Sequence, residues 1–266
     1  MTMISDPRLL DQAADRLMRA QRSRTPCEPV RDLLGEDDVA AAYRVQDLIA
    51  QQRLAAGARV VGRKIGLTAP AVQAQLGVDQ PDSGVLFDDM RVAGDEPVPA
   101  GLLLQPKIEA EVAFVLRADL DHEAPDLAAV RSAIDYAVAA LEIVDSRIRG
   151  WDIRITDTVS DNASSGLFVL GSRRIAMSRF EPADVAMSMT VDATQCSAGS
   201  GADCMGDPLV AVQWLARTCA LHGSPLRAGE VVLSGALGPM VTVSPGALVR
   251  ADLSELGPVS ASFAGR

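Results

Sequence analysis

The alternation of apolar and polar residues is clearest over residues 107–116, where it predicts a β-strand. One face of this strand is apolar and consists of Ile108, Ala110, Val112, Phe114 and Leu116. The opposite face carries Lys107, Glu109 and Glu111. Carboxylates two residues apart on a strand stand about 7 Å from each other and repel, and glutamate is depleted from strands. A divalent cation between the two carboxylates would remove this repulsion.

Apolar residues at helical spacing predict two helices in the first third of the chain. Asp6 and Pro7 are typical of the N-cap and first position of a helix. The buried stripe of this helix is Leu10, Ala13, Ala14 and Leu17. After a loop over residues 22–29, the acidic residues 36–38 favour a second helix start. Its buried stripe is Val39, Ala42, Val45 and Ile49, and Gly57 is expected to end it.

Short apolar runs separated by glycine and proline follow from residue 59 onward. They predict strands over residues 59–65, 84–87, 107–116, 167–170, 186–191, 231–234 and 240–243. Two further helices are expected, one over Leu127–Leu141 and one from Asp207-Pro208 to Gly223. The glycine- and serine-rich segment Gln195–Gly206 predicts a loop or hairpin. Strands in runs with few helices favour an α+β fold with a mixed or antiparallel sheet. We expect a mainly helical region over 1–80 and a β-rich region over 81–266, together forming one compact unit.

Composition narrows the classes of partner. The 266 residues carry a net charge of −10, which disfavours binding to nucleic acid. No apolar run approaches 18 residues and no signal peptide is recognisable, so we expect a cytoplasmic protein without a membrane partner. The four cysteines show no metal-binding spacing and are expected to be reduced thiols; they are Cys27, Cys196, Cys204 and Cys219.

A third carboxylate, Glu142, lies in a segment as apolar as the one around Glu109 and Glu111. Three hard oxygen ligands of this kind suit Mg²⁺ or Mn²⁺ better than zinc. Neither of the two histidines, His122 and His222, has a partner that suggests a catalytic triad. No G-x-S-x-G motif and no dinucleotide-binding fingerprint are present.

Six segments of the chain, in this order, resemble the 2-oxopent-4-enoate (2-hydroxypenta-2,4-dienoate) hydratase family of the fumarylacetoacetate hydrolase superfamily. They are Gly62–Thr68, Gln80–Gly84, Gln105–Glu111, Leu141–Arg147, Asp157–Ser165 and Leu233–Leu237. The resemblance extends from about Glu36 to Phe263. It implies a fumarylacetoacetate-hydrolase-like mixed β-sandwich or β-roll behind an N-terminal helical region. It also implies Mg²⁺- or Mn²⁺-dependent chemistry in bacterial aromatic meta-cleavage pathways, a homo-oligomer and a possible pathway-enzyme partner.

The resemblance implies roles for individual residues. Glu109, Glu111 and Glu142 match the metal ligands of the family, and Lys64 matches its active-site lysine. Asp82 matches a carboxylate in a loop that reaches the site, although a simple turn at Asp82 is an equal alternative. Ser164 and Leu67 fall in segments expected to contact the substrate. Many relatives carry tyrosine or phenylalanine where this chain has Ser83, and if that ring walls their pocket, the resemblance does not fix the substrate shape here.

The activity implied is the addition of water to 2-hydroxypenta-2,4-dienoate, which gives 4-hydroxy-2-oxopentanoate. Lys64 would either stabilise an oxyanion or move a proton, and Asp82 would activate water. A 4-oxalocrotonate (2-oxo-3-hexenedioate) decarboxylase is the main alternative. An acylpyruvate-type C–C hydrolase is a further one, disfavoured because neither histidine lies beside a candidate ligand. A non-catalytic relative would show no affinity for divalent metal ions.

Overall fold

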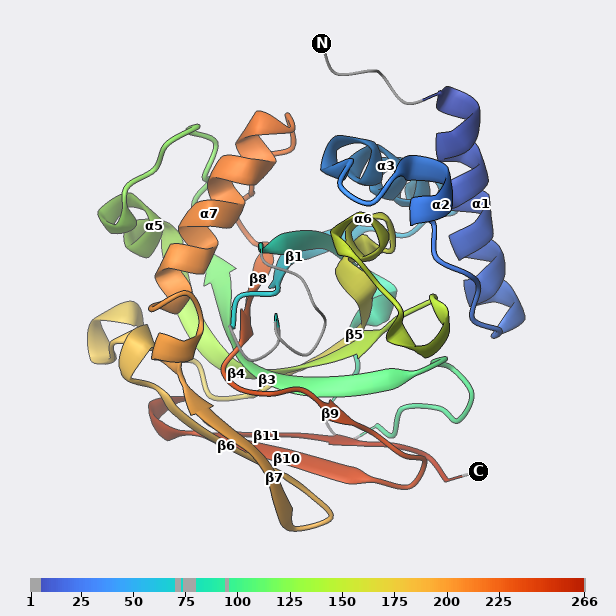
Figure 1. Ribbon diagram of the computed structural model, residues 1–266. Helices are drawn as coiled ribbons and strands as arrows, with labels where there is room; N and C mark the ends of the chain where they lie inside the picture. The colour runs from blue at the N-terminus through green and yellow to red at the C-terminus, as the bar shows by residue number, and fades with distance from the viewer. Residues whose placement is uncertain (1–5, 70–72, 74–79, 94–95, 266) are drawn as a thin grey trace.

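The computed structural model describes residues 6–69, 73, 80–93 and 96–265, and it has two sheets with helices on their flanks (Figure 1). The helices are α1 Pro7–Ser23, α2 Arg31–Leu34, α3 Val39–Ala55, α5 Leu127–Ala133, α6 Ile155–Ser160 and α7 Pro208–Leu221. The strands of the first sheet are β1 Val60–Gly66, β2 Asp82–Phe87, β3 Pro106–Leu116, β4 Ile134–Asp145, β5 Ser165–Leu170, β8 Val231–Ala236 and β9 Val241–Thr242. Those of the second are β6 Ala186–Val191, β7 Thr194–Ser200, β10 Leu248–Leu253 and β11 Gly257–Ser262.

The first sheet is strongly curled and has the strand order β2-β1-β8-β3-β4-β5, with β9 paired to β3. Its ladders are antiparallel except that β1 runs parallel to β8. The second sheet is antiparallel, with the order β11-β10-β6-β7, and it lies against the outside of the curl near β3 and β4. Helices α1, α2, α3 and α6 gather on one side of the curl, and α5 and α7 lie on another (Figure 1). The arrangement is the α+β fold that the sequence predicts.

The largest core lies between the two sheets, and the apolar face of β3 contributes to it as predicted. Ile108, Ala110, Val112, Phe114 and Leu116 are all buried there. They pack in the same cluster as Met189, Val249 and Ala251 from the second sheet. The opposite face of β3, which carries Glu109 and Glu111, therefore faces the inside of the curl.

Aspartate caps begin three of the helices at or next to the predicted positions. Asp6 accepts a hydrogen bond from the Arg8 amide, Asp38 from the Ala41 amide and Asp207 from the Leu209 amide. Such caps contribute roughly 1 kcal/mol each to helix stability. The expected ends are also confirmed, since α3 and α7 stop shortly before Gly57 and Gly223, which have φ values of 100° and 70°.

The predicted helix over Leu127–Leu141 is wrong beyond its first two turns. Helix α5 ends at Ala133, and residues 134–145 form strand β4 instead. Alternate residues of β4 pack into two different cores, with Ala139 and Leu141 on one side and Val138 and Ala140 on the other. Burial on both faces produces a continuous apolar run, which cannot be distinguished from a buried helix by periodicity.

The expected loop or hairpin over Gln195–Gly206 needs a related correction. Thr194–Ser200 forms strand β7, which pairs with β6 along its length. Small residues such as Gly199 are required here because a Cβ at Gly199 would lie 1.8 Å from the carbonyl oxygen of Leu237. Strands β10 and β11 were also not predicted.

Two expectations about the whole chain can be compared with the structure. All four cysteines are free thiols, as expected. None of the helices in the described part of the chain combines the length and apolar character that crossing a lipid bilayer requires. The division near residue 80 stays a prediction, and β1, on its N-terminal side, pairs with β2 on the other.

Candidate metal centre and active site

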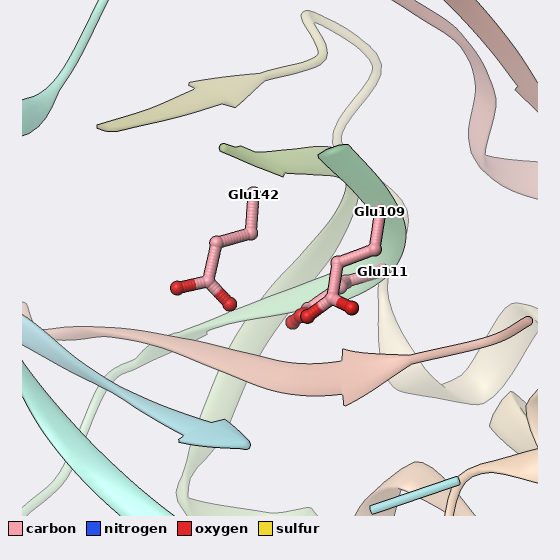
Figure 2. Close-up of side chains that lie close together, drawn as sticks. All are labelled: Glu109, Glu111 and Glu142. Atoms are coloured by element: carbon pink, nitrogen blue, oxygen red, sulfur yellow. The ribbon is translucent and has the colours of Figure 1, made fainter. Parts of the chain in front are cut away.

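Three buried glutamates meet on the inner face of the curled sheet. In the β3–β4 ladder Glu109 lies directly opposite Glu142, and Glu111 is opposite Ala140. One carboxylate oxygen from each glutamate lies within 4.8 Å of the others, and the three groups point into one space (Figure 2). Residues opposite each other on antiparallel strands project to the same side, so the ladder register itself gathers these side chains.

Most oxygens of the three carboxylates make no hydrogen bond within the described part of the chain. Glu111 Oε2 accepts a 2.7 Å hydrogen bond from the Gly235 amide. Within the described residues, Glu109 Oε2, Glu111 Oε1 and both oxygens of Glu142 have no hydrogen-bond partner. An unsatisfied buried acceptor costs about 1–3 kcal/mol, and more when it is charged. An all-oxygen set with four oxygens that accept no hydrogen bond fits a hard divalent cation such as Mg²⁺ or Mn²⁺.

Burial and mutual repulsion disfavour the ionised forms of these glutamates when no cation is bound. Burial and the Glu142 carboxylate raise the pKa of Glu109 to about 7. Burial and both neighbouring carboxylates raise the pKa of Glu111 well above its usual value, and burial raises the pKa of Glu142. A dication would reverse these shifts because it favours every ionised form at once.

Lys64 places an ammonium beside the glutamates. Its Nζ lies 3.3 Å from Glu142 Oε1, and the side chain is 2% exposed. The contact is a buried ion pair that offsets part of the negative charge of the three glutamates. Burial by itself lowers the pKa of Lys64, but Glu142 and the other nearby carboxylates outweigh burial and raise it.

Asp82 lies next to Lys64 at the start of β2. Its Oδ2 accepts a 2.8 Å hydrogen bond from Thr158 Oγ1, whereas Oδ1 has no hydrogen-bond partner among the described residues. Burial raises the pKa of Asp82, although Lys64 and the Thr158 hydroxyl act in the opposite direction. A Cβ at Gly66 would lie 2.2 Å from Asp82 Oδ1 and 3.1 Å from Lys64 Nζ. Glycine at position 66 therefore allows the two groups to approach each other.

The backbone before β5 brings Ser164 to the same place. Asn162, Ala163 and Ser164 have φ values of 54°, 52° and 52°, an uncommon run of left-handed residues. The Asn162 side chain holds this segment against β2, since its Oδ1 accepts from the Val85 amide and its Nδ2 donates to the Val85 carbonyl. Ser164 Oγ lies 3.5 Å from Thr158 Oγ1.

A small cavity that opens to the surface connects these residues. Five of the residues singled out from the sequence line it, namely Lys64, Leu67, Asp82, Glu109 and Ser164. Glu111 and Glu142 complete the carboxylate group beside it. The structure thus brings all seven candidate residues together, while their individual roles stay predictions.

Sequence reasoning missed several residues of the cavity. Thr158, Trp151 and Met240 line it, although none was a candidate. Thr158 lies within Asp157–Ser165, a segment that carried the resemblance, and this is the signal by which it could have been found. Ser83 is the position at which the sequence departs from the family pattern. In the structure, the Tyr43 hydroxyl from α3 lies 3.2 Å from Ser83 Oγ.

Comparison with known proteins finds relatives that match nearly the whole chain. The family model for the fumarylacetoacetate (FAA) hydrolase C-terminal region matches residues 64–264. The chain is 53% identical to a TodF product hydratase of Pseudomonas putida, over 95% of this chain and 94% of the relative. It is 49% identical to a 2-keto-4-pentenoate hydratase of Paraburkholderia xenovorans, over 97% and 96% of the two chains.

Among solved structures, the fold is similar to 4-oxalocrotonate decarboxylase from Pseudomonas putida G7, complexed with magnesium and adipate. The TM-score is 0.90 at 33% sequence identity, with 96% of this chain and 97% of the other covered. The region that the family model matches, residues 64–264, includes Lys64, Asp82, Ser164 and the three glutamates. The matches show that the chain belongs to the fumarylacetoacetate hydrolase family.

Proposed function

We propose that the protein is a divalent-metal-dependent hydratase that converts 2-hydroxypenta-2,4-dienoate and water into 4-hydroxy-2-oxopentanoate. The observation that carries the proposal is the buried group of Glu109, Glu111 and Glu142, next to Lys64, in which four carboxylate oxygens accept no hydrogen bond from the described residues. The names of relatives about 50% identical over nearly the whole chain support the same reaction.

Glu109, Glu111 and Glu142 would hold the cation through their free oxygens. When bound, Mg²⁺ or Mn²⁺ supplies Lewis acidity to the 2-oxo or 2-hydroxy acid end of the substrate. The remaining chemistry falls to side chains around the cavity. Its polar side, with Lys64, Asp82 and Ser164, receives the acid end.

Lys64 is suited to stabilise negative charge on the substrate oxygen at C2. Its surroundings favour the ammonium form, and a buried ammonium interacts strongly with a developing oxyanion because little water screens it. Loss of the C2 hydroxyl proton and addition of a proton at C5 give 2-oxopent-3-enoate, which is conjugated. Lys64 stabilises the charge at C2 during this transfer.

Asp82 is suited to activate the water that adds at C4. Thr158 fixes one oxygen of the carboxylate and leaves Oδ1 free to accept a proton. A hydroxyl group then forms a bond to C4, and C3 takes up a proton, so one water is consumed for each product. General acid–base catalysis of this kind contributes about 10²–10⁴-fold to a rate.

The decarboxylase remains a second candidate because the solved structure with a TM-score of 0.90 has that activity in its name. Its substrate carries a second carboxylate, which would need a cation away from the metal. Among the described residues that line the cavity, the cationic one is Lys64, which lies beside the glutamates. Lys107 lies over the Trp151 ring and is not part of this lining. The rest of the lining includes Val144, Trp151 and Met240. This apolar lining favours a substrate with a hydrocarbon end and hence the hydratase.

The decisive experiment supplies 2-hydroxypenta-2,4-dienoate and 2-oxo-3-hexenedioate separately and identifies the products by NMR. We expect 4-hydroxy-2-oxopentanoate from the first, activity that disappears with EDTA and returns with Mg²⁺ or Mn²⁺, and little CO₂ from the second. Release of CO₂ from the hexenedioate without hydration of the pentadienoate would establish the decarboxylase instead. Absence of both reactions with metal present would contradict the proposal.

The proposal includes the wider setting that the resemblance implies. We place the reaction in the breakdown of aromatic rings after meta-cleavage, in a cytoplasmic homo-oligomer. Light scattering coupled to size exclusion measures the oligomeric state, and a monomeric active enzyme would remove that part of the proposal.

A further inference from the structure

On the inner face of β3 and β4, residues pair across the two strands in rows. The row next to the candidate metal ligands contains no carboxylate. Glu109 pairs with Glu142, and the next pair on the same face is Lys107 with Val144. Successive rows on one face of a sheet lie about 7 Å apart. A short carbon chain anchored at the carboxylates and running along this face therefore reaches the row of Val144.

Trp151 stands at this second row. Lys107 Nζ lies 4.4 Å from the centroid of the Trp151 ring. Trp151 and Val144 both line the cavity that contains Lys64 and Asp82. Trp151 also packs against the apolar cluster that contains Val144, so the indole and Val144 together form an apolar part of the cavity wall.

The Trp151 side chain is held in place by an unusual local backbone. Gly150 and Trp151 have φ values of 64° and 60°, and a bulky residue rarely adopts this left-handed conformation. Gln105 secures the segment: its Oε1 accepts from the Gly150 amide at 2.7 Å, and its Nε2 donates to the carbonyls of Ser146 and Ile148. The indole Nε1 donates to the Gln105 carbonyl at 3.0 Å.

We propose that Trp151 is a specificity-determining residue whose indole closes the hydrocarbon end of the cavity and limits the length of substrate that can be hydrated. The inference rests on the proposed function, because it needs a 2-hydroxydienoate with its acid end at the glutamates. The satisfied Nε1 leaves the ring to act as a rigid apolar wall. A substrate one methyl group longer at C5 would meet this wall.

The first test compares kcat/KM for 2-hydroxyhexa-2,4-dienoate and 2-hydroxypenta-2,4-dienoate in wild type and in Trp151→Leu. One methylene group in an apolar pocket changes specificity by about 10–200-fold, so we expect the hexadienoate/pentadienoate ratio to rise at least about tenfold. Both substrates are assayed on one preparation, so any loss of folded protein cancels in the ratio. Trp214→Leu is the matched control, because Trp214 on α7 packs against the largest apolar core and does not line the cavity, so this variant should leave the ratio unchanged.

The second test uses fluorescence, since the chain has two tryptophans. In Trp214→Phe the emission comes from Trp151 alone, and saturable quenching or a spectral shift is expected when 2-oxopentanoate is added with Mg²⁺. In Trp151→Phe the emission of Trp214 should stay constant.

The outcomes separate this inference from the proposed function. A specificity ratio in Trp151→Leu within twofold of wild type would overturn the inference. So would an unchanged Trp151 emission at 2-oxopentanoate concentrations that inhibit hydration. A wild-type enzyme that hydrates neither dienoate would instead overturn the proposed function on which the inference depends.

Discussion

Glu109 and Glu142 face each other across the β3–β4 ladder, so two strands of one sheet place two buried carboxylates side by side. Like charges directly opposite each other destabilise a sheet. The pairing is therefore unfavourable unless a positive charge is added, and Lys64 balances one of three carboxylates. The register of β3 and β4 is thus the structural origin of the candidate metal centre.

The carboxylate of Glu109 is expected to be essential for metal binding but not for folding. Glu109→Gln keeps the shape of the side chain and removes a negative charge, so Mg²⁺ or Mn²⁺ should no longer raise the melting temperature. Glu255→Gln, at an exposed position, is the control and should show the wild-type metal response. An active Glu109→Gln enzyme without bound metal would contradict the ligand role.

The stability of the metal-free protein should depend on pH through Glu109. Its pKa is raised from 4.5 to about 7 by burial and by Glu142. A carboxyl group with a raised pKa stabilises the native state fully below its unfolded pKa, and this contribution is lost as pH rises through the folded value. In EDTA, the melting temperature of Glu109→Gln relative to wild type should therefore increase between about pH 4.5 and 7. A constant difference across this range would show that the Glu109 pKa is unshifted.

Replacement of Lys64 should separate catalysis from metal binding. Lys64→Met removes the ammonium near the C2 oxygen, and we expect kcat to fall about 10²–10⁴-fold. Metal affinity should be retained or increase, because a competing positive charge is removed from the carboxylates. Calorimetric titration with Mn²⁺ measures this, and the exposed Arg250→Met serves as a control. Loss of metal together with activity would assign Lys64 a structural role.

The Thr158 hydroxyl is expected to tune Asp82. A hydrogen bond to the ionised form lowers the pKa of a carboxyl group, so Thr158→Val should raise the pKa of Asp82 further. The acidic limb of the kcat profile should move to higher pH. Thr156→Val on the same helix removes a hydroxyl that donates to the Glu36 carbonyl, and it should affect stability without moving the limb. Identical pH profiles for both variants would argue against Asp82 as the base.

Gln46 connects the N-terminal helices to the site. Its Nε2 donates to the carbonyls of Ser83 and Val159, which are neighbours of Asp82 and Thr158. Gln46→Leu should lower the free energy of unfolding by about 1–3 kcal/mol, since buried partners lose a hydrogen bond. It should also reduce kcat. The exposed Gln52→Leu on α3 is the matched control in denaturant unfolding and activity assays, and equal stability of the two variants would contradict this expectation.

Patterns among residues close together in the chain were sufficient to predict part of the structure. The caps at Asp6, Asp38 and Asp207, and the alternation over residues 107–116, describe interactions within a few residues or with one buried face. The resemblance carried by six ordered segments identified the family and the seven candidate residues that now lie together. The sequence alone predicts these features because each depends on residues that lie close together in the chain.

Only the tertiary structure decided which segments meet. Strand β4 looks helical in the sequence because both of its faces are buried, and its pairing with β3 places Glu142 opposite Glu109. Likewise, Thr158 and Trp151 reach the cavity through contacts with Asp82 and Gln105, which are distant in the chain. Hydrophobic periodicity carries no information about such long-range partners. Which residues line the cavity is therefore decided only by the tertiary structure, in which the curled sheet brings distant segments together.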